Sequence, residues 1–433
     1  MTKLRIIGNM TGNSMDAVDV VLTEFDEEKI TDICSLSIPY SVAEKQSVDA
    51  LRQRVVTQKI PASELIKDND FLTVHQKYVS GVAKAVNELC RRNNIDKSSV
   101  QAIGFHGKTL DHNPPSLAKI SGTLPFTTQM GSAQLLADLT DIPVINDFRS
   151  ALLMNGFEGA PLAAPHNAHI SRQEGDGCYI NAGNTSNLAW IKDGKAQISW
   201  DAGPFNEYTD SFVLRYKGAA FDRGAHWGLQ GKLLPELLHY LFALGQNFYE
   251  MPLPKSGDPA FYKTSELFAY IENNYENPAK HKQVFYDILH TLEFFAGYLA
   301  AYSVASTPDN IDLAANFVLF GGGWKNPLAR QSFEDTLSGK VPALSQHQKL
   351  FEDFRRRLKA GPQIKYSKLG EFMEARLFAD LARYYLEQRN WELPELQDYN
   401  KPLILGYIRY PGLAPIDDYL SKAARGWQNN INL

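Results

Sequence analysis

Cysteine is scarce in this sequence. Three cysteines occur among 433 residues, Cys34, Cys90 and Cys178, and no CxxC pair is present. Such widely spaced cysteines suit a reducing compartment and provide neither a disulfide framework nor a metal cluster. We therefore expect a cytoplasmic protein in which each cysteine is a small buried hydrophobic residue.

Long apolar runs and blocks of basic charge are also missing. No stretch approaches the roughly 20 apolar residues of a membrane span, and the apolar run before Gly8 is shorter than the core of a secretion signal. The net charge is −5, without a basic block, which argues against a nucleic-acid or anionic membrane surface. We expect no export, no membrane or nucleic-acid partner, and a small-molecule ligand.

Two common nucleotide-binding motifs are absent. AIGFHGKT at 102–109 ends like a Walker A loop, but Ala102 stands where the motif requires glycine, and DHNPPS interrupts the approach to a helix. No GxGxxG follows an expected strand, so a Rossmann cofactor site is not supported.

The apolar patterns that are present predict a mixed α/β fold that repeats itself. The first half reads as three strands, a helix, a strand, a helix and a strand, over 4–10, 17–25, 30–40, 71–92, 100–107, 132–140 and 142–147. The second half restarts with strands and continues with helices around one more strand, over 178–191, 196–203, 283–305, 315–320, 327–337 and 370–389. A last strand is expected within 403–412. We expect one domain at 1–143 plus 398–433 and a second at 144–397.

Each half opens on a turn rich in glycine and asparagine. In GNMTGNSMDAVD at 8–19, Gly8 and Gly12 permit positive φ, and short polar side chains add donors, so the turn could hold an anion. The same residues also suit a plain hairpin turn. The second half has the similar turn NAGNTSN at 181–187, and two such turns would form a phosphate site across a cleft.

Further candidate residues follow expected strands or begin a helix. Asp201 ends a strand in SWDAGPFN and suits either a general base or an Asx turn. In FVLFGGGWKNP at 317–327, the glycines could let a planar ligand ring approach the backbone closely, or they could form a tight connection between a strand and a helix. Glu374 begins a helix, where a carboxylate is also favoured by the helix dipole. His106 lies at a strand end beside Gly107.

Together these motifs resemble the anhydro-N-acetylmuramic acid kinase family, a branch of the actin, hexokinase and Hsp70 superfamily. The resemblance runs nearly end to end. GNMTGNSMDAVD resembles the family's GxMSGTSxDGxD, FHGKT its SHGQT, NDFR its ADFR, NAGNTSN its NIGGxxN and DAGPFN its DxGPGN. Other matching stretches are GAPLAAP, FDRGAHWGLQG, PKS at 254–256, GGGWKNP, MEA at 373–375 and LGYIRYPG.

The resemblance implies an α/β fold of two RNase-H-like (actin-type ATPase) domains with mixed sheets and an interdomain cleft. It implies a kinase that uses ATP and Mg²⁺ to hydrolyse the 1,6-anhydro ring of anhydro-N-acetylmuramic acid and phosphorylate O6 during cell-wall recycling. It also implies a cytoplasmic homodimer. Asp201 matches the base that activates water, and Glu374 matches a catalytic carboxylate that orients water or substrate.

The same resemblance assigns binding residues. The sugar side would use His106, Thr109 and Arg149, and Asp16 would lie on the magnesium side. ATP and its phosphates would be bound by Gly12, Asn13, Ser14, Asp16, Gly183, Ser186, Asn187, Gly321, Gly322, Gly323 and Asn326.

Some positions depart from the family pattern. The departures near the expected phosphate and sugar sites are Asn13, Ala17, Lys108, Ser150, Ala151, Asn184 and Phe205. They leave open a paralogue that acts on another anhydrosugar or small polyol, and an inactive paralogue that only binds nucleotide or sugar. Retention of Asp16, Asp201 and Glu374 favours activity, since charged site residues are costly to keep idle. A third reading, an Hsp70-like conformational ATPase, lacks a peptide-binding domain.

Overall fold

The computed structural model describes residues 3–12, 15–27, 29–257, 259–341, 344–358, 360–396, 399, 401–414 and 418–426. The chain forms two compact units, Met1–Gln173 with Phe372–Leu433, and Glu174–Glu371. These boundaries differ from the expected 143/144 and 397/398. The reason is that β7 (Val144–Asn146) pairs with β4 (Ala102–Phe105) in the first unit's sheet, and α14 (Met373–Leu386) packs on β1 (Leu4–Met10) of the same sheet.

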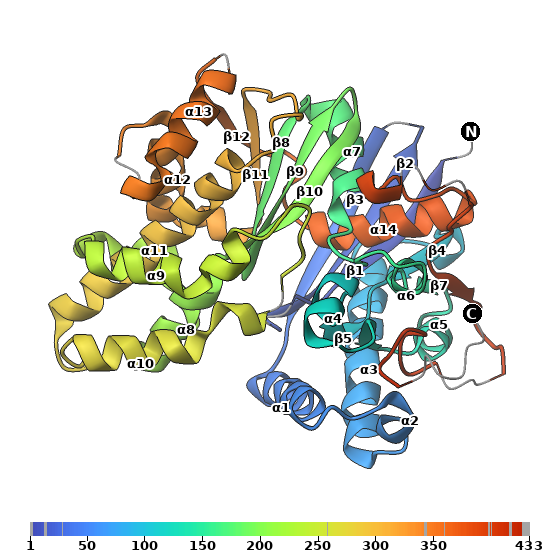
Figure 1. Ribbon diagram of the computed structural model, residues 1–433. Coiled ribbons are helices and arrows are strands. Elements are labelled where there is room, and N and C mark those ends of the chain that lie inside the picture. Colours follow the sequence, from blue (N-terminus) through green and yellow to red (C-terminus); the bar gives the residue numbers. More distant parts are fainter. Residues whose placement is uncertain are drawn as a thin grey trace. The chain divides into compact units, whose positions relative to one another are not determined.

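The first unit is built on a six-stranded sheet with the order β13-β7-β4-β1-β2-β3, and a separate ribbon of β5 and β6 (Figure 1). Strands β1 to β3 form an antiparallel meander, whereas β4 and β7 continue the sheet in parallel. The remaining strands are β2 (Ala17–Asp26), β3 (Lys29–Pro39), β5 (Lys108–Asn113), β6 (Phe126–Met130) and β13 (Tyr407–Arg409). The helices besides α14 are α1 (Val42–Gln58), α2 (Ala62–Leu65), α3 (Asn69–Arg92), α4 (Pro115–Ser121), α5 (Ala133–Thr140), α6 (Ser150–Met154) and α7 (Ala163–Glu174).

The second unit has a five-stranded sheet with the order β10-β9-β8-β11-β12. Its strands are β8 (Gly177–Ala182), β9 (Thr185–Lys192), β10 (Lys195–Pro204), β11 (Asn316–Phe320) and β12 (Gln363–Tyr366). Its helices are α8 (Asn206–Lys217), α9 (Pro235–Tyr249), α10 (Thr264–Asn274), α11 (Lys282–Ala305), α12 (Pro327–Ser338) and α13 (Gln348–Leu358).

The two sheets share one topology. Numbered by appearance within each sheet, the strands follow the order third, second, first, fourth, fifth, which is β3-β2-β1-β4-β7 in the first unit and β10-β9-β8-β11-β12 in the second. The sheet of the first unit has β13 as an additional strand beside β7. In both, the first three strands are antiparallel and the fourth lies parallel to the first. The expected duplication of a mixed α/β unit is therefore confirmed, and with it the RNase-H-like fold class.

Most expected elements are present, and the misses have local causes. The sequence analysis placed no helix or strand in 148–166, but this segment contains α6 and the start of α7, because its glycines and prolines obscure the helical pattern. Helix α1 was not expected because it buries only Val48, Leu51 and Val55 and its outer faces are polar. The residues after Gly107 form strand β5 rather than a helix, which agrees with rejecting a Walker A loop.

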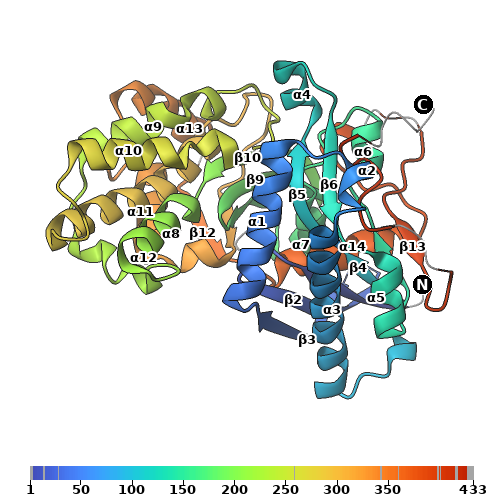
Figure 2. The same ribbon diagram turned by 90° about the horizontal axis from the view of Figure 1, so that it is seen from below.

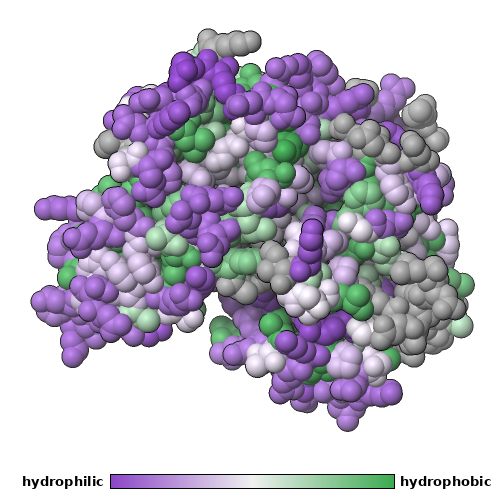
Figure 3. Space-filling view, in the orientation of Figure 1, coloured by the Kyte–Doolittle hydropathy of each residue, from purple (hydrophilic) through white to green (hydrophobic). Residues whose placement is uncertain are grey.

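Each unit has its own hydrophobic core. One core of the first unit lies between its sheet and helices such as α3 and α5, and the second unit's core surrounds α11. Helix α11 is long and apolar enough to cross a membrane by length and composition, which the sequence analysis did not anticipate. However, 89% of its apolar stretch is buried inside the protein, as for a core helix. The face seen in Figure 3 is covered mostly by hydrophilic residues, with hydrophobic ones scattered among them.

Helix α14 lies unusually close to the first unit's sheet. A Cβ atom on Gly8 in β1 would lie 1.9 Å from the carbonyl oxygen of Ala375, and one on Gly104 in β4 would lie 2.0 Å from that of Phe378. Both contacts are with backbone atoms, which cannot rotate away. Gly8 is thus needed for close approach, not for the positive φ that the sequence analysis considered, since it belongs to an extended strand.

Gly104→Ala should therefore destabilise the first unit strongly. The added methyl group would push α14 off the sheet, and we expect a loss of about 2–4 kcal/mol in the free energy of unfolding. Gly81→Ala is the matched control, because Gly81 lies inside α3 with no atom within 4 Å of its would-be Cβ. That change should stabilise the protein by about 0.5–1 kcal/mol through helix propensity. Denaturant unfolding compares the two variants, and equal stabilities would contradict the close packing of α14.

Candidate active site

In the first unit, the expected site residues follow the ends of three neighbouring strands. Asn9 of β1 pairs with Phe105 of β4, which pairs with Asn146 of β7, and these strands are parallel. Their carboxyl ends therefore reach the same edge of the sheet. The segments that follow are 11–16, 106–109 and 147–149. This edge carries Gly12, Asp16, His106, Thr109 and Arg149.

His106 and Arg149 are brought together at this edge. Arg149 donates from Nε to His106 Nε2 at 3.1 Å and from Nη1 to the Gly159 carbonyl at 2.6 Å. His106 Nδ1 lies 2.9 Å from the Gly107 carbonyl, so Nδ1 carries the proton and Nε2 accepts. Burial, followed by the Arg149 charge, lowers the pKa of His106 well below its ordinary value. His106 is thus a neutral imidazole that orients the Arg149 guanidinium.

Two other predicted residues of this edge are in less constrained positions. Thr109 in β5 is opposite Gln129 of β6, whose Nε2 lies 3.5 Å from the Thr109 hydroxyl. Asp16 is exposed, and its Oδ1 lies 3.6 Å from Lys45 Nζ. Asn13 and Ser14 lie outside the described residues. Glu374 is an exposed residue of the first turn of α14, which the glycines of β1 and β4 hold against the sheet.

In the second unit, a single row of paired residues connects the expected base with both glycine turns. Asp201 of β10 is opposite Asn187 of β9, which is opposite Asn181 of β8, which in turn is opposite Phe320 of β11. The hairpin at 183–184 begins just beyond Asn181, and the glycine loop at 321–323 begins just beyond Phe320. The sheet thus gathers the predicted base and two candidate phosphate-binding turns at one end.

Asp201 is held by donors from a loop rather than by its own turn. Its Oδ2 accepts from Gly257 N at 2.8 Å and from the Ser256 hydroxyl at 3.3 Å, and its own N–H donates to the Lys255 carbonyl at 3.0 Å. The side chain is 9% exposed. A β-bulge between Asp201 and Gly203 interrupts the pairing with β9. These contacts give a fixed, mostly buried carboxylate.

Lys255, inside the PKS stretch, lies beside Asp201 and was not among the predicted site residues. Its ammonium group donates to the carbonyls of Phe248 at 2.9 Å and Tyr249 at 2.6 Å, and the side chain is buried. Burial lowers the pKa of Lys255 to about 8, against the opposing effect of the Asp201 charge. The only signal in the sequence was the PKS match itself.

Some glycines of the two turns have free space beside the Cα atom, and others are packed against neighbouring atoms. A Cβ on Gly322 would meet no atom within 4 Å, and one on Gly183 would meet only the Thr185 carbonyl, at 3.7 Å. In contrast, a Cβ on Gly321 would lie 2.5 Å from the Ala182 carbonyl, and one on Gly323 would lie 2.7 Å from the Phe205 ring. Gly183 and Gly322 therefore leave room for a ligand, whereas Gly321 and Gly323 allow the chain to pack.

Three other predicted binding residues of this unit have structural partners. Ser186 donates to the Asn181 carbonyl at 2.8 Å, which fixes the base of the hairpin. Asn187 lies in the row between Asp201 and Asn181. Asn326 caps α12, where its Oδ1 accepts from Leu328 N and Ala329 N, both at 3.0 Å. These contacts shape the turns that surround Gly183 and Gly322.

Phe205, a departure from the family pattern beside the base, belongs to the core. It is 2% exposed, and its ring lies edge-on to Trp324 with centroids 4.7 Å apart. Its backbone N–H donates to the Asn184 carbonyl at 2.8 Å. The Phe205 ring therefore fills the space above Gly323 within the second unit.

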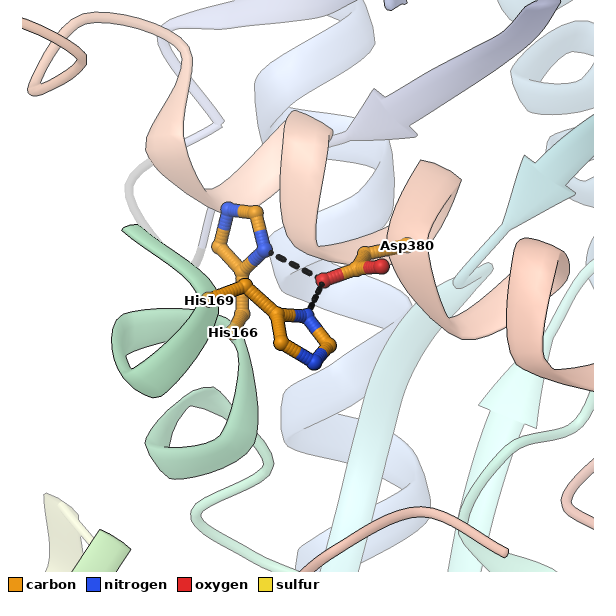
Figure 4. Close-up of side chains that lie close together, drawn as sticks. All are labelled: His166, His169 and Asp380. Carbon is orange, nitrogen blue, oxygen red and sulfur yellow. Dashed lines mark hydrogen bonds and ion pairs between the residues drawn. The ribbon is translucent and has the colours of Figure 1, made fainter. Parts of the chain in front are cut away.

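A buried group of two histidines and an aspartate lies between α7 and α14 in the first unit (Figure 4). Oδ2 of Asp380 is 2.8 Å from His166 Nδ1 and 2.6 Å from His169 Nδ1. Tyr384 lies 2.6 Å from His169 Nε2, and Arg383 lies 2.9 Å from the other carboxylate oxygen. Burial opposes ionisation, but the Arg383 charge and both histidines hold the pKa of Asp380 well below its usual value.

These distances describe hydrogen bonds rather than metal ligation. Each Nδ1 must carry a proton to donate to Asp380, so neither has a lone pair for a metal on that side. The Arg383 guanidinium would also repel a cation. The group therefore joins α7 to α14 and is not a candidate metal centre.

A buried carboxylate that the sequence analysis did not single out is Glu293 in α11. It is 1% exposed, and burial, followed by the charge of nearby Asp222, raises the pKa of Glu293 to about 9. Asp222 itself accepts from Gly228 N at 2.9 Å and Trp227 N at 2.9 Å. The signal was present: a single glutamate interrupts the apolar run ILHTLEFFAGYLA.

Glu293→Gln should change the pH dependence of stability. Because the folded pKa lies above the unfolded value, the folded state binds the extra proton, and the glutamate makes the protein less stable as the pH rises from about 5 to about 9. Glutamine removes this loss. We expect similar melting temperatures for both proteins at pH 5 and a melting temperature at least about 3 °C higher for the variant at pH 8.5. A constant difference across this range in calorimetry would contradict a protonated Glu293.

The comparisons agree with the geometry. The family model described as anhydro-N-acetylmuramic acid kinase matches residues 4–411. A protein of that name from Nitrosospira multiformis is 29% identical over 94% of this chain and 98% of its own length. Another from Legionella pneumophila (strain Paris) is 27% identical over 94% and 98% of the two chains.

A solved structure, component A of the (R)-2-hydroxyglutaryl-CoA dehydratase of Acidaminococcus fermentans, aligns with a TM-score of 0.37 and 12% identity over 87% of this chain and 96% of that chain. An alignment at this score carries no information about activity. The family match, in contrast, spans both units and includes every site segment described above. The chain belongs to the anhydro-N-acetylmuramic acid kinase family, whose members transfer a phosphoryl group.

Proposed function

We propose that this protein uses ATP to open the 1,6-anhydro ring of anhydro-N-acetylmuramic acid and to phosphorylate O6, as a step of cell-wall recycling in the cytoplasm. The observation that carries the proposal is the row from Asp201 to the turns at Gly183 and Gly322, in a chain matched by the family model over 4–411. The proposal includes a homodimer, as the family resemblance implies.

Asp201 acts as the base. Its carboxylate, fixed by Gly257 and Ser256, takes a proton from a water molecule whose oxygen attacks C1 of the sugar. The C1–O6 bond breaks, and O6 attacks the terminal phosphorus of ATP, with ADP as the leaving group. Glu374 orients the water or the sugar, and Arg149, held by His106, binds a sugar oxygen.

The residues of the glycine turns fit a nucleotide. Gly183 and Gly322 leave open space where backbone N–H groups could reach phosphate oxygens, which favours ATP as the ligand. Mg²⁺ prefers carboxylate and phosphate oxygens, and the exposed carboxylate of Asp16 is of the right kind. When bound with the nucleotide, the ion would offset phosphate charge.

The sugar itself admits one alternative. The family's arginines after DFR are replaced by Ser150 and Ala151, and Ser150 is buried, with its hydroxyl donating to Asp147 at 2.5 Å. This position therefore offers no cation to the lactyl carboxylate of the muramic acid. An anhydrosugar without that carboxylate is the second candidate substrate, and 1,6-anhydro-N-acetylglucosamine is the compound to compare.

Asp201→Asn should lower kcat by about 10³-fold without loss of folding, since the amide keeps the shape but cannot take the proton. Sugar-dependent ADP release measures the effect with both anhydrosugars. Asp193→Asn is the matched control, because Asp193 is exposed in the turn that joins β9 to β10 and should leave kcat unchanged. More than a tenth of the activity in Asp201→Asn would contradict the base, and no sugar-dependent turnover by the natural protein would contradict the function.

A further inference from the structure

A buried lysine lies against the first glycine turn. Lys108 is the first residue of β5 and is 1% exposed, and its Nζ donates to the Gly12 carbonyl at 2.8 Å. Gly12 belongs to the segment 11–16 that follows β1. The family resemblance places a glutamine at this position, so the cation is a feature of this chain and not of the pattern.

Charged side chains of α1 also lie near Lys108. Lys45, Asp49 and Arg52 lie at positions i, i+4 and i+7 and therefore on one face of this helix. Helix α1 packs on β5, and Figure 2 shows the two side by side. The charges of these three residues and of Asp16 all act on Lys108, and Lys45 also reaches Asp16 at 3.6 Å. Two of these four charges are positive and two are negative, so the net charge of the group depends on whether Lys108 is protonated.

Burying an ammonium group is costly. Burial, followed by repulsion from Arg52, lowers the pKa of Lys108 to about 7. A doubly charged phosphate beside Nζ would stabilise the ammonium charge and so compensate for the hydration that the group loses on burial. A lysine is suited to this role because it contacts a phosphate oxygen as a compact charge with three donors.

We propose that Lys108 binds the terminal phosphate of ATP beside Gly12 and offsets the charge of that group during its transfer to the sugar. In the complex with the nucleotide the amine of Lys108 is protonated, and it forms no covalent bond. The inference rests on the proposed function only for the identity of the acceptor, since binding of the nucleotide phosphate can be measured without any sugar.

Calorimetric binding of ATP with a non-hydrolysable imido β–γ bridge, compared with binding of ADP, tests the assignment. In Lys108→Gln, which restores the family residue, affinity for the ATP analogue should fall about tenfold and affinity for ADP should change less than twofold. Lys108→Arg should recover part of the loss, because the cation is kept. Lys84→Gln, an exposed lysine of α3, is the control and should bind both nucleotides like the natural protein.

Proton uptake gives a second readout on the unaltered protein. At pH 8 the analogue should bind with uptake of a proton, seen as a dependence of the binding enthalpy on the ionisation enthalpy of the buffer, because the arriving phosphate recharges Lys108. ADP should bind with much less uptake, and Lys108→Gln should abolish the uptake with the analogue. This readout decides the matter even where the variant fails to fold.

Several outcomes would overturn the assignment. In Lys108→Gln, these are an equal loss of affinity for both nucleotides or no loss of affinity for either. In the natural protein, it is the absence of proton uptake when the analogue binds. A rise in KM for the sugar, with nucleotide binding and kcat unchanged, would place Lys108 at a carboxylate of the sugar instead. If the natural protein shows no turnover with either anhydrosugar but analogue binding still depends on Lys108, the proposed function fails and this inference stands.

Discussion

The close approach of α14 to β1 and β4 is the constraint on which the first unit depends. Gly8 and Gly104 allow the helix backbone to lie where a methyl group would otherwise stand. This contact fixes the position of Glu374 at the start of the helix and brings Phe378 against the His106 ring, with centroids 4.6 Å apart. The buried Asp380 then holds α7 to the same helix through two histidines. Both chain crossings between the units, at 173/174 and 371/372, adjoin these two helices.

The repeated topology explains why the candidate residues occur where they do. In each unit the first and fourth strands are parallel neighbours, so their carboxyl ends reach one edge of the sheet. In each unit, the turn after the first strand therefore lies next to the loop after the fourth strand. In one unit they are the residues at Gly12 and the His106 segment, and in the other they are the Gly183 hairpin and the Gly321 loop.

Several buried ionisable groups are held in environments that disfavour their charge. Burial lowers the pKa of Lys108 to about 7 and of Lys255 to about 8, and raises the pKa of Glu293 to about 9. Lys108 contacts Gly12 and Lys255 contacts Asp201, which are both candidate site residues. Such groups cost stability, and their concentration near candidate binding residues is what a functional site would show.

The sequence by itself determined the fold class, the duplication, the family and the segments that carry the candidate site residues. Strand alternation and the order of glycine turns are local patterns, and a motif such as DAGPFN can be located in the sequence without the structure. The sequence did not determine where the units divide, because that depends on the pairing of β7 with β4 and the packing of α14 on β1. It also left Phe205 and the glycines ambiguous. Only the tertiary structure placed the Phe205 ring over Gly323 and showed which glycines have free space beside them and which are packed against other atoms. It also brought Lys108 to Gly12, which lies 96 positions earlier in the chain. The reason is that long-range contacts leave no local pattern in the sequence.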